Sequence, residues 1–299
     1  MNPSSQDSSP LAEKPPPPEL STAPLSPGLY VVATPIGNLR DITLRALDVL
    51  AGADLVLAED TRVTGKLLAA YGLKKPLVRY DEHAAERARP KVLAALAEGR
   101  RVALVSDAGT PLISDPGFRL VREAIEQGAA VIPIPGASAG VAALSVAGLP
   151  TDRFLFAGFP PSKTAARRAL FAELAPSRAT LVFYEGAARL GASLKDMAAV
   201  FGPREAVVAR ELTKLYETVI RGTLDVLAAD PRLEAPKGEV VVLVSPGAED
   251  AASPADADAA LAEALTRVGP SEAAAEVAGA LGLSRRDLYR RALELKGAL

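Results

Sequence analysis

The chain has 299 residues, of which 49% are hydrophobic and 23% are charged, and its formal net charge is −2. These values fit a globular protein with room for two domains or one large one, and they argue against a protein that coats nucleic acid through bulk positive charge. With no cysteine and a single histidine, disulfides, thiolate metal sites and multi-histidine metal clusters are excluded, so we expect no metal.

Residues 1–27 are rich in proline, including the run Pro15 to Pro18, and show no apolar periodicity. Such a composition cannot bury a core, so we expect a disordered tail. The segment lacks the basic start and continuous apolar stretch of a secretory signal, and no run of about 18 apolar residues predicts a membrane span. We therefore expect a cytoplasmic protein without a membrane partner.

Apolar strands and helices alternate over residues 28–148, the first predicted domain. The predicted strands are Leu29–Thr34, Asp54–Glu59, Leu77–Tyr80, Arg101–Ser106 and Ala130–Ile134. The predicted helices are Ile42–Ala51, Thr64–Tyr71, Ala84–Glu98, Phe118–Glu126 and Ala139–Ala147. Nearly all-apolar strands that alternate with helices indicate βαβ units and a parallel sheet buried on both faces.

Three of these strands end in Gly/Pro loops that contain no lysine. The loops are Thr34-Pro35-Ile36-Gly37-Asn38, Asp107-Ala108-Gly109-Thr110-Pro111 and Pro135-Gly136-Ala137-Ser138-Ala139-Gly140. In a parallel sheet they emerge at the carboxyl edge, where ligands bind. The central loop supplies the carboxylates of Asp107 and Asp115, which would repel a polyphosphate. We therefore predict a pocket for a neutral or partly cationic small molecule.

Residues 149–247 form a second predicted α/β domain. Its expected strands are Phe154–Ala157, Thr180–Tyr184, Ala206–Arg210, Glu217–Gly222 and Glu239–Val244, with helices near Thr164–Leu174 and Ala187–Val200. The short turn between the third and fourth strands indicates an antiparallel pair, so we expect a mixed sheet.

An Ala/Asp/Pro stretch after Gly247 is interpreted as a linker to a helical module over residues 255–299. Ser284 and Asp287 have the spacing of a capping box for the last helix, and Gly282 precedes them at the turn. The outline is that of a helix-turn-helix. Arg286 and Arg290 lie one turn apart on the last helix, where they either contact phosphate or form a solvated face of a dimerisation or capping module.

Six motifs in a fixed order resemble one family. They are Thr34-Pro35-Ile36-Gly37-Asn38, Ala58-Glu59-Asp60-Thr61-Arg62, Asp107-Ala108-Gly109-Thr110-Pro111, Pro135-Gly136-Ala137-Ser138-Ala139, Arg210-Glu211-Leu212-Thr213-Lys214 and Lys237-Gly238-Glu239. Together they are similar to the ribosomal RNA small subunit methyltransferase I family, within the tetrapyrrole methylase superfamily. The resemblance extends from Gly28 to the end of the chain.

This resemblance implies two α/β domains with a ligand cleft between them and a homodimeric enzyme. It implies transfer of a methyl group from S-adenosylmethionine to the ribose 2′-oxygen of cytidine 1402 in 16S ribosomal RNA, within the small ribosomal subunit. The residues that match the superfamily's donor contacts are Pro35, Gly37, Asp107, Gly109, Thr110, Ser138, Ala139, Tyr184 and Leu212. A sulfonium donor without phosphate agrees with the pocket predicted from the loops.

Proton removal from the ribose hydroxyl requires a general base or a cation that stabilises the developing alkoxide. The candidates are Lys214, Glu59, Asp60, Arg62 and Glu211. Each has an alternative structural interpretation: Asp60 is also placed to cap a helix and pair with Arg62, and Lys214 is also placed to form a surface salt bridge.

A basic loop at the Gly158-Phe159-Pro160-Pro161-Ser162 segment is the favoured RNA contact, with Lys163, Arg167 and Arg168 as its cations. We expect this loop to be flexible and to grip RNA as a lid; a solvated helix face is the alternative. For the whole protein, two other functions stay open: a tetrapyrrole-type small-molecule methylase, and a non-catalytic ligand-binding regulator.

Overall fold

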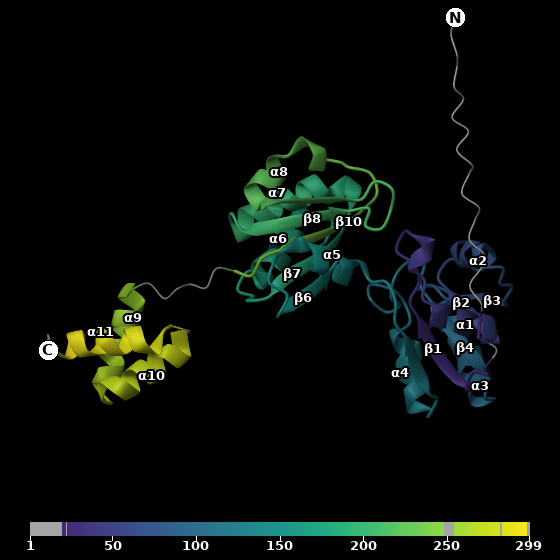
Figure 1. Ribbon diagram of the computed structural model, residues 1–299, viewed down its shortest axis with the longest axis horizontal. Coiled ribbons are helices and arrows are strands. Elements are labelled where there is room, and N and C mark those ends of the chain that lie inside the picture. The colour runs from purple at the N-terminus through teal and green to yellow at the C-terminus, as the bar shows by residue number, and fades with distance from the viewer. Residues whose placement is uncertain (1–19, 22, 248–253, 282, 298–299) are drawn as a thin grey trace, which may run out of the picture. The chain divides into compact units, whose positions relative to one another are not determined.

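The computed structural model describes residues 20–21, 23–247, 254–281 and 283–297 (Figure 1). Contacts divide the chain into two compact units, with the division between Ala139 and Gly140. Most of the predicted disordered tail, and residues 248–253 of the predicted linker, lie outside the described residues.

The first unit contains a five-stranded parallel sheet with the order β3-β2-β4-β1-β5 (Figure 1). Its strands are β1 (Gly28–Val32), β2 (Leu55–Ala58), β3 (Leu77–Arg79), β4 (Arg101–Val105) and β5 (Val131–Ile134). The predicted parallel sheet is therefore confirmed, with slightly shorter strands.

Helices cover both faces of this sheet because alternate strand residues are apolar on both sides. One core contains Tyr30, Val32 and Val56 against α1 (Leu44–Gly52) and α2 (Thr61–Ala70). The other contains Leu29, Leu57 and Leu104 against α3 (Ala85–Ala97) and α4 (Phe118–Glu126). A short 3-10 helix, η1 (Leu39–Asp41), precedes α1. The result is a three-layer unit whose strand ends are left free for a site.

The residues just before β1 correct the predicted extent of the disordered tail. Leu25 packs against the core on the α1 side of the sheet, and the Tyr30 hydroxyl donates to the Ser26 carbonyl at 2.7 Å. Residues 23–27 are thus part of the folded unit. The prediction of disorder was based on proline content and did not take into account the burial of the apolar Leu25 side chain.

The second unit contains a mixed five-stranded sheet with the order β6-β7-β10-β8-β9. Its strands are β6 (Phe154–Gly158), β7 (Thr180–Gly186), β8 (Glu205–Arg210), β9 (Thr218–Thr223) and β10 (Glu239–Val244). Only β6 and β7 pair in parallel; β10 runs antiparallel to β7 and β8, and β8 runs antiparallel to β9. The predicted mixed sheet and antiparallel pair are confirmed.

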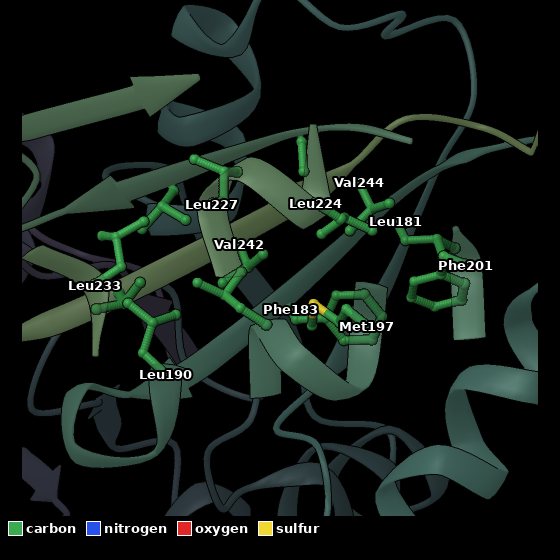
Figure 2. Packing of buried hydrophobic residues seen from close by; sticks show 14 of the residues in the cluster. Leu181, Phe183, Leu190, Met197, Phe201, Leu224, Leu227, Leu233, Val242 and Val244 are labelled. Atoms are coloured by element: carbon green, nitrogen blue, oxygen red, sulfur yellow. The ribbon is translucent and has the colours of Figure 1, made fainter. Parts of the chain in front are cut away.

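One face of this sheet packs on α6 (Thr164–Leu174), α7 (Leu190–Phe201) and the shorter α8 (Leu224–Ala229). Figure 2 shows Phe183 of β7 and Val242 of β10 directed toward Leu190, Met197 and the neighbouring apolar side chains of this core. Two 3-10 helices, η2 (Ala187–Arg189) and η3 (Pro231–Leu233), complete the connections.

Helix α5 (Ala139–Ala147) corrects the predicted domain boundary at residues 148/149, because almost all of it groups with the second unit. The Gly140 N–H donates to the Tyr184 hydroxyl of β7 at 3.1 Å. At the other end of the helix, Arg221 of β9 donates through Nε to the Ala147 carbonyl at 3.0 Å. A cation at a helix C-terminus satisfies its last carbonyls, so α5 is held at both ends by the second sheet.

Three helices form a separate module, α9 (Pro254–Leu265), α10 (Pro270–Leu281) and α11 (Arg285–Gly297). They share a small core that includes Leu261, Val277 and Leu288. The Asp287 N–H bonds to Ser284 Oγ at 3.4 Å, which agrees with the predicted cap. The predicted helical module is confirmed, although its first helix already begins inside the Ala/Asp/Pro stretch interpreted as linker.

Candidate functional site

The three Gly/Pro loops of the first unit meet at the carboxyl edge of its sheet, as predicted. Thr34 and Gly109 pair across two loops, with Thr34 N–H to Gly109 O at 2.8 Å and Gly109 N–H to Thr34 O at 3.1 Å. The Thr110 hydroxyl donates to the Ala137 carbonyl of the third loop at 3.1 Å. The predicted donor contacts Pro35, Gly37, Asp107, Gly109, Thr110, Ser138 and Ala139 all lie on these loops.

The central loop has an unusual backbone. Leu112 and Ser114 adopt positive φ angles of 72° and 66°, as do Gly109 at 82° and Gly117 at 133°. A Cβ on Gly109 would lie 3.3 Å from Ile36 Cγ2, and one on Gly117 would lie 2.9 Å from Leu104 Cδ2. Non-glycine residues in this region carry backbone strain, which concentrates at binding and catalytic sites.

Carboxylates from neighbouring strands gather at the same edge. Asp107 Oδ1 accepts the Asp60 N–H at 2.9 Å, which joins the loops after β4 and β2. Desolvation raises the pKa of Glu59, and the charges of Asp115, Asp107, Asp81 and Asp60 raise it further. Desolvation also raises the pKa of Asp115 to about 6, against a lowering contribution from the Ser106 hydroxyl. The edge is therefore strongly anionic.

Asp60 and Arg62 form the helix cap and ion pair that the sequence offered as the alternative to a catalytic role. Asp60 caps α2 by accepting the Arg62 N–H at 2.8 Å, and its carboxylate pairs with the Arg62 guanidinium at 2.6 Å. These hydrogen bonds lower the pKa of Asp60. A carboxylate of lowered pKa is a poor proton acceptor, so of the two acidic residues after β2, Glu59 is the better candidate base.

In the second unit, the Arg210–Lys214 and Lys237–Glu239 motifs meet at one end of the sheet. Lys214 Nζ lies 2.9 Å from Glu211 Oε1 and 2.8 Å from Glu239 Oε2. Desolvation lowers the pKa of Lys214, but its hydrogen bonds with Glu239 and Glu211 outweigh this, and the pKa is raised. These contacts favour a cation held by two carboxylates over a deprotonated base as the role of Lys214.

Glu211 is held in place by hydrogen bonds with Glu239. Its φ is 53°, its N–H donates to the Glu239 carbonyl at 3.0 Å, and its Oε1 accepts the Glu239 N–H at 2.9 Å. The hydrogen bond from Lys214 lowers the pKa of Glu211. A Cβ on Gly238 would collide with this carboxylate, so glycine is required there. Glu211 therefore holds the Lys214 ammonium group in place.

The two donor contacts predicted for the second unit, Tyr184 and Leu212, both have contacts within the fold. Tyr184 holds the start of α5 as described above, and Leu212 is 9% exposed. Next to Tyr184, the buried Glu185 accepts the Gly186 N–H at 2.8 Å, pairs with Arg189 at 2.7 Å and accepts a hydrogen bond from the Ser193 hydroxyl. Glu185 is therefore a structural anchor.

The basic loop residues separate into buried and exposed groups. Arg167 is 3% exposed, its Nε donates to Asp196 Oδ2 at 2.7 Å, and its guanidinium also binds the Ser162 carbonyl at 3.1 Å. An RNA contact for Arg167 is thus wrong, because Asp196 and the loop carbonyls take up its donors. Lys163 and Arg168 are exposed, so their RNA contact stays a prediction, and Arg168 is also paired to Asp196 at 2.6 Å.

On the helical module, Arg286 and Arg290 are both exposed on α11. Arg290 pairs with Asp287 at 2.8 Å. Among the described residues, no group of acidic or histidine side chains has the arrangement of a metal site. Within the same residues, no helix combines the length and apolarity needed to cross a membrane.

Asp115 was recognised in the sequence as a pocket carboxylate but not as a titrating group. Its raised pKa follows from burial in the strained loop, and burial of a single aspartate within a Gly/Pro loop leaves no periodic signal in the sequence.

Comparison with known proteins places the fold in a class. The sequence model for Tetrapyrrole (Corrin/Porphyrin) Methylases matches residues 28–228, and the model for the RsmI C-terminal HTH domain matches residues 251–296. A crystal structure of uroporphyrin-III-C-methyltransferase from Thermus thermophilus is similar with a TM-score of 0.52 and 25% identity, covering 73% of this chain and 93% of that one. A crystal structure of diphthine synthase shares the fold, with a TM-score of 0.54 and 18% identity, covering 73% of this chain and 89% of that one. The two sheets therefore have the fold of the tetrapyrrole methylases.

Sequence relatives narrow this class. Proteins called Ribosomal RNA small subunit methyltransferase I are 51% identical in Mesorhizobium japonicum, over 93% of this chain and 95% of the relative, and 55% identical in Erythrobacter litoralis, over 92% and 98%. The relative of that name from Escherichia coli O157:H7 is 45% identical over 90% and 96%. The chain belongs to the ribosomal RNA small subunit methyltransferase I family.

Proposed function

We propose that this protein transfers a methyl group from S-adenosylmethionine to RNA of the small ribosomal subunit, at the ribose 2′-oxygen of cytidine 1402 in 16S ribosomal RNA. The observation that carries the proposal is the meeting of the three family loops through the Thr34–Gly109 and Thr110–Ala137 hydrogen bonds. The family membership supplies the reaction class, and the position and atom on the RNA come from the resemblance.

The residues at the loop edge fit this donor. S-adenosylmethionine carries a sulfonium and an ammonium group but no phosphate, and the edge presents Asp107, Asp115 and Glu59 with no lysine in the loops. Gly109 keeps its backbone free of a side chain at a crowded point, where a Cβ would lie 3.3 Å from Ile36 Cγ2. The residues that would hold the donor are Pro35, Gly37, Asp107, Gly109, Thr110, Ser138 and Ala139, and from the second unit Tyr184 and Leu212.

When bound, the donor supplies the activated methyl group, and the protein's task is to position the ribose oxygen in line with it. Glu59 is the proposed proton acceptor, because its raised pKa brings it nearer to neutrality and it follows β2 at the loop edge. Lys214, kept protonated by Glu211 and Glu239, is the proposed cation for a phosphate or for the developing oxyanion.

The RNA contacts are proposed for exposed cations: Lys163 just before α6, Arg168 on α6, and Arg286 and Arg290 on α11. Phosphate contacts of this kind position an RNA without reading its sequence. We place the enzyme in the cytoplasm as a homodimer, with the small ribosomal subunit as its partner.

One experiment separates this function from its alternatives. The purified protein is incubated with labelled S-adenosylmethionine and, separately, 30S subunits, bare 16S RNA or uroporphyrinogen. Label in RNA, mapped to cytidine 1402 and resistant to base removal, supports the proposal. Label in the porphyrin indicates a small-molecule methylase, and no label anywhere indicates a ligand-binding regulator; either result overturns it.

A further inference from the structure

Phe159 is an exposed aromatic residue with a fixed support. It follows β6 directly and 54% of its surface is exposed. Its ring lies 5.6 Å from that of Tyr184 in an edge arrangement, at 68° between the planes. Tyr184 is itself fixed, by the ring of Phe156 at 4.7 Å and by the Gly140 N–H at 3.1 Å. Phe159 is therefore presented to solvent from a rigid aromatic base.

The backbone around Phe159 is held rather than free, which corrects the expectation of a flexible loop. Arg167 Nη1 donates to the Ser162 carbonyl at 3.1 Å and to the Pro161 carbonyl at 3.4 Å. Arg189 Nη1 donates to the Pro160 carbonyl at 3.4 Å. Because both prolines fix φ and two arginines bind the carbonyls, the loop is preorganised.

Two exposed cations follow the ring closely in the sequence. Lys163 stands at the start of α6 four residues after Phe159, and the Arg168 side chain is 53% exposed. Proteins bind unpaired nucleic acid by combining exposed aromatic rings, on which bases stack, with cations that meet the phosphates. A purely apolar partner would find these charges unfavourable.

We propose that Phe159 is a stacking site for a nucleobase of unpaired substrate RNA, with Arg167 and Arg189 as the positioning residues that hold its loop. The inference rests on the proposed function, since it assigns the RNA substrate to this surface. It adds a recognition element that depends on the π-face of a base rather than on phosphate charge.

The test measures methylation of 30S subunits by the full chain and by the variants F159A, F159L, F159Y and F159W, with S-adenosylmethionine affinity measured by calorimetry for each. We expect F159A and F159L to raise KM for the subunits about tenfold, with donor affinity unchanged. Tyrosine and tryptophan restore KM because they retain an aromatic face. Phe154, 51% exposed at the other end of β6, provides the matched control F154A, which should behave as wild type.

Three results overturn the stacking site: an F159A enzyme with wild-type KM, an F159L enzyme that matches wild type and so requires only apolar contact, or a loss of donor affinity in F159A. A wild-type enzyme that labels no RNA overturns the proposed function instead. The two failures are thus distinguished by the wild-type reaction.

Discussion

Thr34 and Gly109 form a two-residue antiparallel bridge between loops that follow two parallel strands, β1 and β4. The bridge is possible because Gly109 has a φ of 82°, a conformation that glycine adopts without strain. The bridge fixes where the two loops lie relative to each other at the sheet edge. The pocket proposed for the donor therefore depends on one backbone conformation.

Replacing Gly109 by valine should disrupt that pocket. The new side chain would start 3.3 Å from Ile36 Cγ2 on a backbone that disfavours it, and we expect S-adenosylmethionine affinity to fall at least about tenfold. Calorimetry measures this directly. Gly72 has a similar φ of 70° but no atom within 4 Å of its Cβ position, so Gly72→Val controls for backbone strain alone. Equal affinities in both variants would remove Gly109 from the donor site.

Lys214 is expected to act as a cation. Its hydrogen bonds with Glu239 and Glu211 raise its pKa against desolvation, so it stays protonated at neutral pH. Lys214→Arg should then retain much of the methylation rate, while Lys214→Gln should lose at least about tenfold. Initial rates with 30S subunits at several pH values provide the measurement. If Lys214→Arg is inactive and the wild-type rate increases as the lysine deprotonates, Lys214 acts as a base instead.

The Arg167–Asp196 pair should contribute strongly to stability, because both side chains are about 95% buried. Asp196→Ala leaves the Arg167 charge without its partner, and we expect a loss of about 3–5 kcal/mol in the free energy of unfolding. Urea denaturation followed by circular dichroism measures it. Glu126→Ala breaks the exposed pair with Arg122 and should be neutral within error. Similar losses in both variants would contradict the assigned role of burial.

Much of this architecture follows from local sequence signals. Apolar runs bounded by Gly/Pro loops predict the first sheet, and parallel strands bring their loops to one edge whatever the details of packing. The cap at Asp60 was likewise among the predicted alternatives, because a short polar side chain before a helix has few other uses.

Other features depend on contacts between distant residues. Arg167 and Arg168 are identical neighbours in the sequence, and only the direction of α6 relative to Asp196 of α7 makes one buried and the other exposed. Helix α5 has the same composition whichever sheet it covers; the Tyr184 and Arg221 hydrogen bonds that hold it come from strands much later in the chain. Periodicity within a segment carries no information about such partners.

Asp115 should make stability depend on pH. Desolvation raises its folded pKa to about 6, above an unfolded value of about 3.9. Below the unfolded pKa the carboxyl is protonated in both states, and the stability of the fold is not reduced. As the pH rises through the folded pKa, the unfolded chain loses its proton more readily than the folded one, so the free energy of unfolding falls. Between about pH 4 and pH 6 the wild type should therefore lose about 1 kcal/mol relative to Asp115→Asn, after allowance for solvent screening.

Unfolding by urea at several pH values measures the difference between the two proteins, and the exposed Asp152 supplies the control Asp152→Asn. A wild type and an Asp115→Asn variant with parallel pH profiles would show that Asp115 is not buried as described.

Arg286 distinguishes the two interpretations of the helical module. It is exposed in the first turn of α11, away from the small core that contains Leu288 and Ala292. If it contacts phosphate, Arg286→Ala should weaken 30S binding and reduce the salt dependence of the binding constant by about one charge. Donor affinity should be unchanged. Arg267, paired with Glu276 at 2.8 Å in the same module, gives the control Arg267→Ala. If the Arg286 variant binds subunits with wild-type affinity and salt slope, the module serves packing or dimerisation, and its proposed RNA contact is wrong.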